Sequence, residues 1–498
     1  MKLIIGGMVY YNGKIENYDI LIDKEKIVGI GKFESVGKEI IDATGLLILP
    51  GGIDTHVHFC DPGFTYREDF ETGSKAAVSS GITTVIDMPC TSIPQVKNRE
   101  SLYFKLNEIK NKSYCDYALY GGITGDMVRD KKFKDIEELY SEGVVGFKIY
   151  SFSSAPYFEN LSYGEMLELF KYFKKDDILI TIHAEDYSII NHYMEIAQKE
   201  ENLSEGEKWI LARPYLAEVI SILVSSRLIK DTNLRFNVTH ISTSEGVKIV
   251  KERKEEGLKI RCETTPHHLL LTYDDLIKNP KLVKTSPPVR CFENRELMWK
   301  FLKEGFIDGV CSDHFAGDWE KEKNKENIFE VAAGISGIDT IFPLLFSEGV
   351  MKGRISINRF VEVISENPSK FFKLYPKKGK IDIGSDADLI FIDKNRVWDI
   401  KGESFYSKGK YTPFEGVKIY GKVVKTIIRG ELVYDEHKGF LVDKGFGKFI
   451  RRIDWIRGGE NDKYFDIFWA FMFFNKMGRG RNINWSIFKF RRCLRFLR

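Results

Sequence analysis

Short apolar runs alternate with longer amphipathic stretches through the middle of the chain. The stretches place an apolar residue every three or four positions, as one face of an amphipathic helix requires: FETGSKAAVSS, FKDIEELYSE, GEMLELFKYFKK, AEVISILVSSRLIK, SEGVKIVKERKEEG and RELMWKFLKEG. The eight short runs lie at residues 47–58, 83–89, 116–123, 143–150, 178–185, 235–242, 260–267 and 308–314. Strands that alternate with helices predict parallel βα units. We therefore predict an α/β fold, a TIM-like (β/α)8 barrel over residues 49–375.

Both ends of the predicted barrel are flanked by β-rich sequence. Residues 1–48 alternate short β-like runs with turns, as in KLIIGGMVYY and YDILIDKEKIVGIGK, and residues 376–445 do the same in KIDIGSDADLIFID and GVKIYGKVVKTIIRGELVY. Two β segments around a long middle predict one small β-sandwich built from both chain ends.

The final segment, residues 446–498, has a different composition. It is aromatic and basic, and its last twenty residues carry seven Lys or Arg and no acid. Its apolar centre, residues 464–474, is too short to span a bilayer. We expect either a basic amphipathic surface helix or a tail of uncertain order.

Composition narrows the class of protein. A net charge of +3 and 30% charged residues give no reason to expect a nucleic-acid partner. The seven cysteines are scattered without a CxxC pair, which is typical of reduced thiols in a cytoplasmic protein. The N-terminus has no long apolar region, and no run of about 18 apolar residues occurs, so we expect neither a signal peptide nor a membrane span.

Histidines and one aspartate gather at the predicted strand ends. His56 and His58 form an HxH in which both imidazoles lie on the same side of an extended strand, so that both can reach one metal ion. His183, His240 and Asp313 end the fifth, sixth and eighth runs. A single strand-end histidine is more often structural, but this set at one mouth of a barrel predicts metal binding.

Lys148 ends the fourth run, in GVVGFKIY, and points at the same mouth. A free ammonium would be repelled by nearby metal ions. Addition of carbon dioxide to the amine gives N6-carboxylysine, whose carbamate is an anionic ligand able to bridge two metals. The alternative is an interior lysine held in an ion pair.

The segments HVHFCDPG, GFKIY, TIHAED, NVTHIS, TTPHHLLLT, SPPVR and CSDH resemble those of the cyclic amidohydrolases, the group of dihydroorotase, allantoinase and hydantoinase. The resemblance covers residues 1–443 and implies a site with two divalent ions, usually zinc (Zn²⁺). It assigns His56, His58, Lys148 and Asp313 to one ion, and Lys148, His183 and His240 to the other. Asp313 is then also the acid and base that moves a proton from water to the ring nitrogen as the ring opens.

Three positions bear on the ring that is opened. The dihydroorotase pattern holds a substrate carboxylate with Arg, Asn and His where this chain has Cys60, Cys90 and Gly317. A thiol does not replace a bidentate guanidinium. An allantoin-type ureide therefore ranks first, with dihydroorotate, and hydantoin or dihydropyrimidine, as alternatives. Cys60, Cys90 and Ser286 are predicted to contact the substrate, although both cysteines could be inert small residues.

Other classes of function stay open. One alternative is a scaffold protein of the same fold without catalytic activity, but such a protein would lack the metal ligands. Another is a protein that binds a membrane or nucleic acid, and that function would depend on the basic tail alone. His267 and His268 could line the mouth or pack, and His314 is expected to support Asp313. By analogy with relatives we expect a homo-oligomer, a dimer or tetramer.

Overall fold

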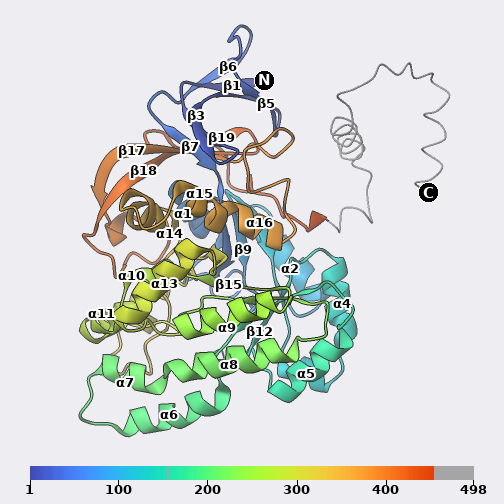
Figure 1. The fold of residues 1–498 in the computed structure, drawn as a ribbon, viewed down its shortest axis with the longest axis vertical. Coiled ribbons are helices and arrows are strands. Elements are labelled where there is room, and N and C mark those ends of the chain that lie inside the picture. The colour runs from blue at the N-terminus through green and yellow to red at the C-terminus, as the bar shows by residue number, and fades with distance from the viewer. Residues whose placement is uncertain (154, 156, 454–498) are drawn as a thin grey trace, which may run out of the picture. The chain divides into compact units, whose positions relative to one another are not determined.

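The computed structural model describes residues 1–153, 155 and 157–453, so the predicted tail lies outside the described residues from position 454 onward. The described chain is α/β, as predicted. A β-rich layer built from both ends of the sequence lies on one side, and the parallel strands and their helices lie below it in Figure 1.

The central parallel strands form two sheets. The strands are β8 (Gly52–Val57), β9 (Ile82–Asp87), β10 (Asp116–Leu119), β11 (Gly121–Gly122), β12 (Phe147–Tyr150), β13 (Leu179–His183), β14 (Arg235–Val238), β15 (Ile260–Thr264) and β16 (Gly309–Val310). One sheet contains β8 to β10 and the other β11 to β16, and within each sheet every strand pairs with the next along the chain. β10 and β11 are two parts of the third predicted run, interrupted at Tyr120. A parallel bridge between Val57 and His314 joins the last run to the first.

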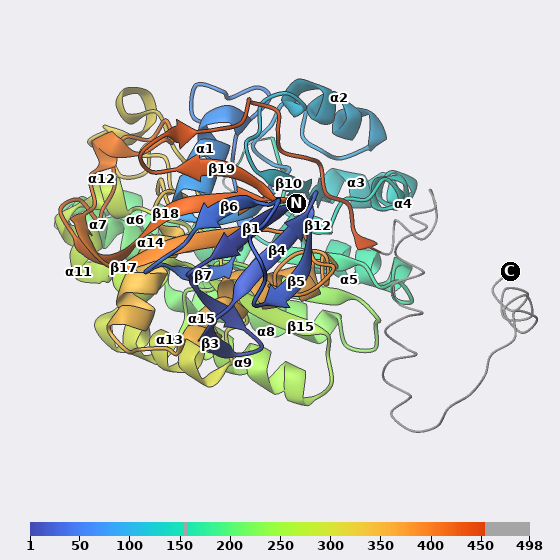
Figure 2. The same cartoon turned by 90° about the horizontal axis from the view of Figure 1, so that it is seen from above.

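Helices follow most of these strands and surround them (Figures 1 and 2). They are α1 (Phe70–Ser80), α2 (Arg99–Ile109), α3 (Gly125–Arg129), α4 (Phe133–Ser141), α5 (Tyr163–Tyr172), α6 (Tyr187–Lys199), α7 (Glu205–Ala212), α8 (Tyr215–Leu228), α9 (Ser244–Glu255), α10 (Pro266–Leu270), α11 (Tyr273–Lys278), α12 (Pro280–Val283), α13 (Phe292–Glu304), α14 (Ile341–Leu344), α15 (Ile357–Val361) and α16 (Asn367–Phe371).

Helix α1 illustrates how local sequence sets these elements. The Asp69 carboxylate caps its start by accepting from the Thr72 amide, and Gly81 ends it with a left-handed φ of 100°. The face between them, which includes Phe70, Ala77 and Val78, is buried in the main hydrophobic core. Glu71 and Lys75 stay partly exposed, whereas the buried hydroxyls of Ser74 and Ser80 donate to carbonyls of the helix itself.

Two sheets make up the β-rich layer. One contains β1 (Lys2–Ile5), β4 (Asp19–Asp23), β5 (Lys26–Gly31) and β6 (Glu39–Asp42). The other contains β2 (Met8–Tyr11), β3 (Lys14–Asn17), β7 (Leu47–Pro50), β17 (Leu389–Asp399), β18 (Lys418–Ile428), β19 (Glu431–Asp435) and β20 (Gly439–Phe440). Because β7 pairs antiparallel with β17, strands from the two ends of the chain share this second sheet.

The structure shifts two predicted boundaries. β7 extends the N-terminal β region from residue 48 to Pro50, because its side chains are buried in the sheet with β17. Residues 446–453 also belong to the folded unit and not to a separate tail. Phe449 bridges Tyr117 beside β10, the Ile450 amide donates to the Tyr117 carbonyl, and a Cβ at Gly447 would lie 1.9 Å from the Cys115 carbonyl oxygen.

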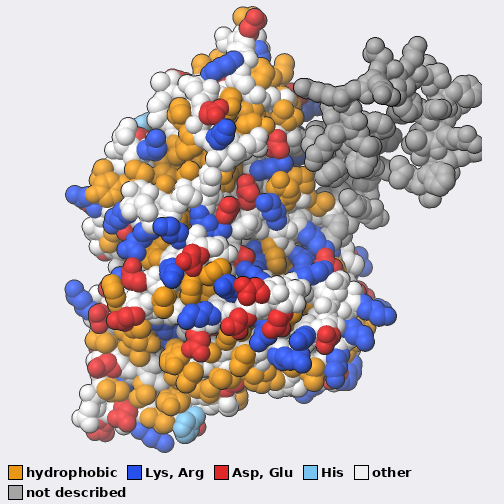
Figure 3. All heavy atoms as spheres, viewed as in Figure 1, with side chains coloured by type: hydrophobic (Ala, Val, Ile, Leu, Met, Phe, Trp, Pro, Cys, Tyr) orange, Lys and Arg blue, Asp and Glu red, His pale blue; other side chains and the backbone are white. Residues whose placement is uncertain are grey.

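Within the described residues, one helical stretch, Glu205–Leu228, is long and apolar enough to cross a membrane, with a mean hydropathy of 1.3. More than half of it is buried inside the molecule, which is equally typical of a core helix. The face of the molecule in Figure 3 mixes Lys, Arg, Asp and Glu side chains and shows no large basic patch among the described residues.

Candidate metal centre

The parallel strands bring the predicted ligands to one place. His56 lies near the end of β8 and His58 just after it, Lys148 lies in β12, and His183 ends β13. His240 and Asp313 follow β14 and β16. Five of these side chains come from the carboxyl ends of parallel strands or the residues just after them, and Lys148 comes from within β12. The carboxyl ends are where a parallel α/β fold places its reacting groups.

The histidines meet in two pairs. The Nε2 atoms of His56 and His58 are 3.2 Å apart, and the Nδ1 of His183 is 3.2 Å from the Nε2 of His240. The rings of His56 and His240, with centroids 5.1 Å apart, join the pairs. Ring nitrogens that face each other so closely share either one proton or one cation.

Asp313 completes the first pair. Its Oδ1 lies 3.3 Å from the Nε2 of His56 and 3.5 Å from the Nε2 of His58. One ligand atom from each of these three residues lies within 4.8 Å of the other two, which fits a single divalent cation. His240 and Asp313 also have left-handed φ values of 39° and 48°, a costly conformation of the kind that gathers at functional sites.

Lys148 supplies the strongest indication that the site takes metal ions. Its side chain is fully buried, and its Nζ has no hydrogen-bond partner among the described residues. Burial lowers its pKa to about 8, so a neutral amine is accessible near neutral pH. An amine without a partner among the described residues, beside the imidazoles of His56, His183 and His240, is poorly explained as an ion pair, but it fits a carbamate that ligates metal.

The histidines of the centre differ in how readily each one holds a proton. Burial and the neighbouring Lys148 hold the pKa values of His56 and His240 well below the usual range, so both imidazoles are neutral. Burial also opposes a proton on His58, but Cys90 and Asp313 outweigh it and raise the pKa of His58 to about 9. Neighbours that stabilise a proton there would likewise stabilise a cation.

Partners on the outer side fix three of the rings. The Nδ1 of His56 lies 2.7 Å from the Thr239 hydroxyl, and the Nδ1 of His58 lies 3.2 Å from the Thr91 hydroxyl. The Nε2 of His183 donates to the Glu185 carboxylate at 2.8 Å. Hydrogen bonds of this kind set the tautomer of a ligating histidine and leave the other nitrogen free for metal.

The predicted substrate residues differ in their surroundings. Cys60 is fully buried, and its thiol donates to the His58 carbonyl at 3.3 Å, so it offers no charge to a substrate. The Sγ of Cys90 lies 3.1 Å from the Tyr150 hydroxyl and 3.9 Å from the Nδ1 of His58. Ser286 is partly buried, and its buried hydroxyl has no partner among the described residues.

His268 and His314 have structural partners. His268 lies 2.9 Å from the Thr265 hydroxyl through Nδ1 and 3.1 Å from the Pro287 carbonyl through Nε2. His314 faces Glu68, with 3.1 Å between its Nε2 and the carboxylate, and so points away from the centre while anchoring the strand that carries Asp313. His267 is buried beside His268, and its Nε2 has no partner among the described residues.

A second group of acids, Asp116, Asp386 and Asp388, also has oxygens within 4.8 Å of one another. The ammonium of Lys378 lies 2.6, 3.0 and 2.7 Å from the carboxylates of Asp116, Asp386 and Asp388. Lys26 also pairs with Asp386, and Arg429 with Asp116. This cluster is therefore a buried ion-pair network and not a second metal site.

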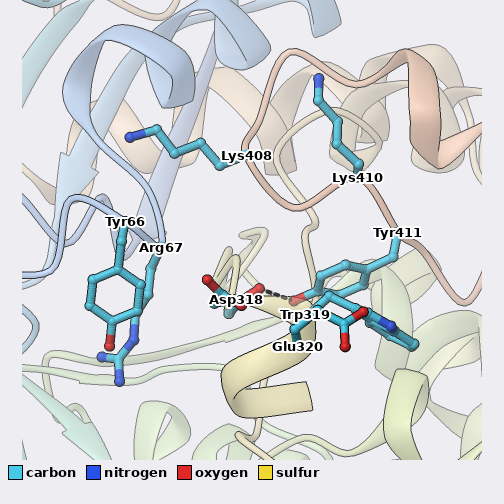
Figure 4. Close-up of a pocket in the computed structure, with 9 residues that line it drawn as sticks. Tyr66, Arg67, Asp318, Trp319, Glu320, Lys408, Lys410 and Tyr411 are labelled. Carbon is cyan, nitrogen blue, oxygen red and sulfur yellow. Dashed lines mark hydrogen bonds between the residues drawn. The ribbon is translucent and has the colours of Figure 1, made fainter. Parts of the chain in front are cut away.

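A cavity of about 460 Å³ opens among the loops that follow β8 and β16 (Figure 4). Its walls carry Tyr66, Arg67, Gly317, Asp318, Trp319, Glu320, Lys408, Lys410 and Tyr411. The Phe315 ring lies between this cavity and the centre, 6.2 Å from the His58 ring and 5.4 Å from the Arg67 guanidinium. Arg67 is paired with Glu322 and Lys408 with Asp69, so neither is a free cation for a carboxylate.

Sequence reasoning missed Glu185, Thr239, Thr91 and Tyr150. Glu185 carried a usable signal, since it stands two residues after His183 at a strand end and therefore on the same side. The two threonines and Tyr150 carried none, because hydroxyls and aromatic rings are common at strand ends.

Comparison with known proteins gives a consistent result. Residues 47–433 match the model of the amidohydrolase family. An allantoinase of Bacillus licheniformis is 35% identical over 457 residues, 90% of this chain and 99% of the relative. An L-hydantoinase of Paenarthrobacter aurescens is 33% identical over 447 residues, 88% of this chain and 95% of the relative. The solved L-hydantoinase (dihydropyrimidinase) of Arthrobacter aurescens is 32% identical, has a TM-score of 0.86, and is matched over 99% of its length by 90% of this chain.

Proposed function

The chain belongs to the amidohydrolase family, and we propose that it hydrolyses a C–N bond of a small cyclic amide, with an allantoin-type ureide as the first choice of substrate. The observation that carries the proposal is the fully buried, unpartnered Nζ of Lys148 among His56, His183 and His240. We infer that the parallel strands close into the (β/α)8 barrel expected from the sequence, and that its mouth is the active site.

We propose two divalent ions, zinc first, as the cofactors. His56, His58, Asp313 and a carbamylated Lys148 would hold one, and the same carbamate with His183 and His240 the other. Bound there, the ions would lower the pKa of a water molecule and polarise the scissile carbonyl. Histidine, carboxylate and carbamate ligands fit zinc, cobalt, manganese or iron equally well.

Asp313 is the proposed acid and base. It is the carboxylate of the centre, its side chain is 14% exposed, and it therefore faces the space from which substrate and water arrive. It takes a proton from the attacking water and gives it to the ring nitrogen as the C–N bond breaks. The product is an open-chain carbamoyl or ureido acid.

Tyr150 and Ser286 are the proposed contacts to the ring. The Tyr150 ring stacks on His183 with centroids 5.2 Å apart, and its hydroxyl has a thiol as its partner. A thiol is a weak hydrogen-bond partner, so the hydroxyl can turn to a substrate carbonyl at little cost. Ser286 presents an unpartnered hydroxyl.

The choice of ring depends on what is absent from the three carboxylate-binding positions. Cys60 is tied to the backbone, Cys90 to Tyr150, and Gly317 has no side chain, so none of them pairs with the free carboxylate of dihydroorotate. A neutral ring is therefore favoured. The hydantoinase or dihydropyrimidinase alternative has specific support from the similar L-hydantoinase, while dihydroorotase is the weaker alternative.

The test compares allantoin, hydantoin, dihydrouracil and dihydroorotate side by side with zinc-loaded protein. Turnover of allantoin without turnover of dihydroorotate is the expected result. Turnover of dihydroorotate alone would contradict the substrate ranking, and turnover of none of the four rings would contradict the proposed function.

We also propose a cytoplasmic homo-oligomer. The exposed apolar residues Tyr215, Leu216 and Leu223 on α8 offer one surface for a second copy. Light scattering of the purified protein would give the number of chains in the assembly.

A further inference from the structure

His183 differs from His56 and His58 in the charge of its outer partner. The latter two bond the neutral hydroxyls of Thr239 and Thr91. His183 instead donates from Nε2 to Oε2 of Glu185, a carboxylate with no solvent exposure. A carboxylate acceptor makes the opposite ring nitrogen more basic and holds the ring in one orientation, whereas a hydroxyl does so weakly.

Glu185 is itself held from the other side. The same Oε2 accepts from Nη1 of Arg213, which is 1% exposed and lies just beyond the end of α7. The Arg213 guanidinium lies 4.7 Å from the centre of the Trp209 ring and 5.0 Å from that of Phe152. Arg290 fixes the Arg213 backbone by donating to its carbonyl at 2.8 Å.

The pair keeps Glu185 charged in an interior that would otherwise neutralise it. The Oε2 atom of Glu185 lies between the Arg213 guanidinium and the Nε2 of His183, so the carboxylate is ion-paired on one side and hydrogen-bonded on the other. An anion therefore faces the Nε2–H of His183, which leaves the Nδ1 lone pair directed at His240. The hydroxyl of Ser151 fixes the turn between the two residues by accepting from the Glu185 amide and donating to the His183 carbonyl.

We propose that Glu185, clamped by Arg213, is a positioning residue that sets the metal affinity of the His183 and His240 half of the centre separately from the His56, His58 and Asp313 half. The inference rests on the proposed metal centre. It predicts an asymmetric defect, since loss of the carboxylate weakens one of two adjacent metal sites and leaves the other intact.

The experiment measures metal stoichiometry and affinity, by chelator competition and elemental analysis, on the full chain. Glu185→Gln keeps the size of the side chain and removes its charge. Because this leaves Arg213 buried without a counter-charge, the double variant Glu185→Gln with Arg213→Met restores neutrality and packs a thioether on Trp209 and Phe152. Thermal unfolding of the metal-free proteins reports the structural cost of each change.

Glu218→Gln is the matched control. Glu218 is 2% exposed, and it accepts from the backbone and hydroxyl of Ser242, which stands two residues after His240 as Glu185 stands after His183. Glu218 is therefore a buried acid of α8 that bonds the residue at the equivalent place after β14, but it bonds no histidine.

We expect wild type and Glu218→Gln to hold two ions, and both Glu185 variants to hold the first ion unchanged and the second about 10- to 100-fold more weakly. Recovery of wild-type affinity in the double variant, or an equal loss in Glu218→Gln, would reduce Glu185 to a structural role and overturn the inference. A wild-type protein that binds no metal would overturn the proposed centre and this inference with it.

Discussion

Replacing Asp313 with asparagine separates its chemistry from its place in the fold. The substitution keeps the shape of the side chain but removes its charge and its capacity to take a proton. Asp313 has a φ of 48°, and asparagine adopts this left-handed conformation about as readily as aspartate. Alanine would add a backbone cost of roughly 1–2 kcal/mol, so Asp313→Asn is the cleaner change.

The size of the effect follows from the position of the carboxylate. Asp313 reaches both His56 and His58 within 3.5 Å and faces the accessible side of the centre, so it is both a ligand and the proton carrier. Loss of general acid and base catalysis lowers rates by about 10²- to 10⁴-fold. We therefore expect kcat/KM to fall by about 10³-fold or more, which corresponds to about 4 kcal/mol or more in the activation barrier.

The assay follows ring opening of the best substrate at saturating zinc, together with metal content and thermal unfolding. Asp231→Asn is the matched control, because Asp231 also has a left-handed φ, of 68°, but is exposed on the surface. Both variants should unfold near the wild-type temperature, and the control should keep its activity. An Asp313→Asn protein that keeps its metal and more than about a tenth of wild-type kcat/KM would refute the assignment of Asp313 as the proton carrier.

Three further predictions test other parts of the centre. Tyr150→Phe should lower kcat by about 10²-fold, because the variant loses the hydroxyl that meets the developing oxyanion. Its free energy of unfolding should change by less than about 1 kcal/mol, since the ring keeps its stacking on His183. The exposed control Tyr157→Phe should keep its kcat, and an unchanged kcat in Tyr150→Phe would exclude the contact. Removal of divalent ions by chelation should abolish hydrolysis. Zinc should restore it when bicarbonate is present, because the Lys148 amine, which bonds no described residue, needs carbon dioxide to become a ligand. Full recovery in buffer free of carbon dioxide would argue against the carbamate. Burial lowers the pKa of Lys284 to about 6, so between that pH and about 10 the unfolded chain binds a proton that the folded chain does not, and stability rises with pH. Urea midpoints measured across this range should therefore rise less steeply for Lys284→Met than for wild type, and an equal slope would contradict the assignment.

The sequence alone was sufficient for the α/β class and for most of the elements. The stretch FETGSKAAVSS is α1 to the residue, because its apolar spacing, the Asp69 cap and Gly81 all act within a dozen positions. The eight apolar runs each contain a strand of the parallel series, since strands buried on both faces leave continuous apolar sequence. The sequence also placed the candidate ligands at the ends of these runs, because the runs themselves are a local pattern: His56, His58, Lys148, His183, His240 and Asp313. The amidohydrolase family was recognised from the motifs around them.

Tertiary structure decided what depends on residues far apart in the chain. Pairings between segments hundreds of positions apart place Leu47–Pro50 beside β17 and residues 446–453 beside β10. No local pattern encodes such pairings. That no described residue bonds the Nζ of Lys148 could be seen only once every neighbouring strand was in place. The clamp of Arg213 on Glu185 likewise joins the end of α7 to the end of β13. Periodicity and capping are short-range properties of a chain, whereas burial, charge pairing and the orientation of a ligand arise from what the fold brings beside each residue.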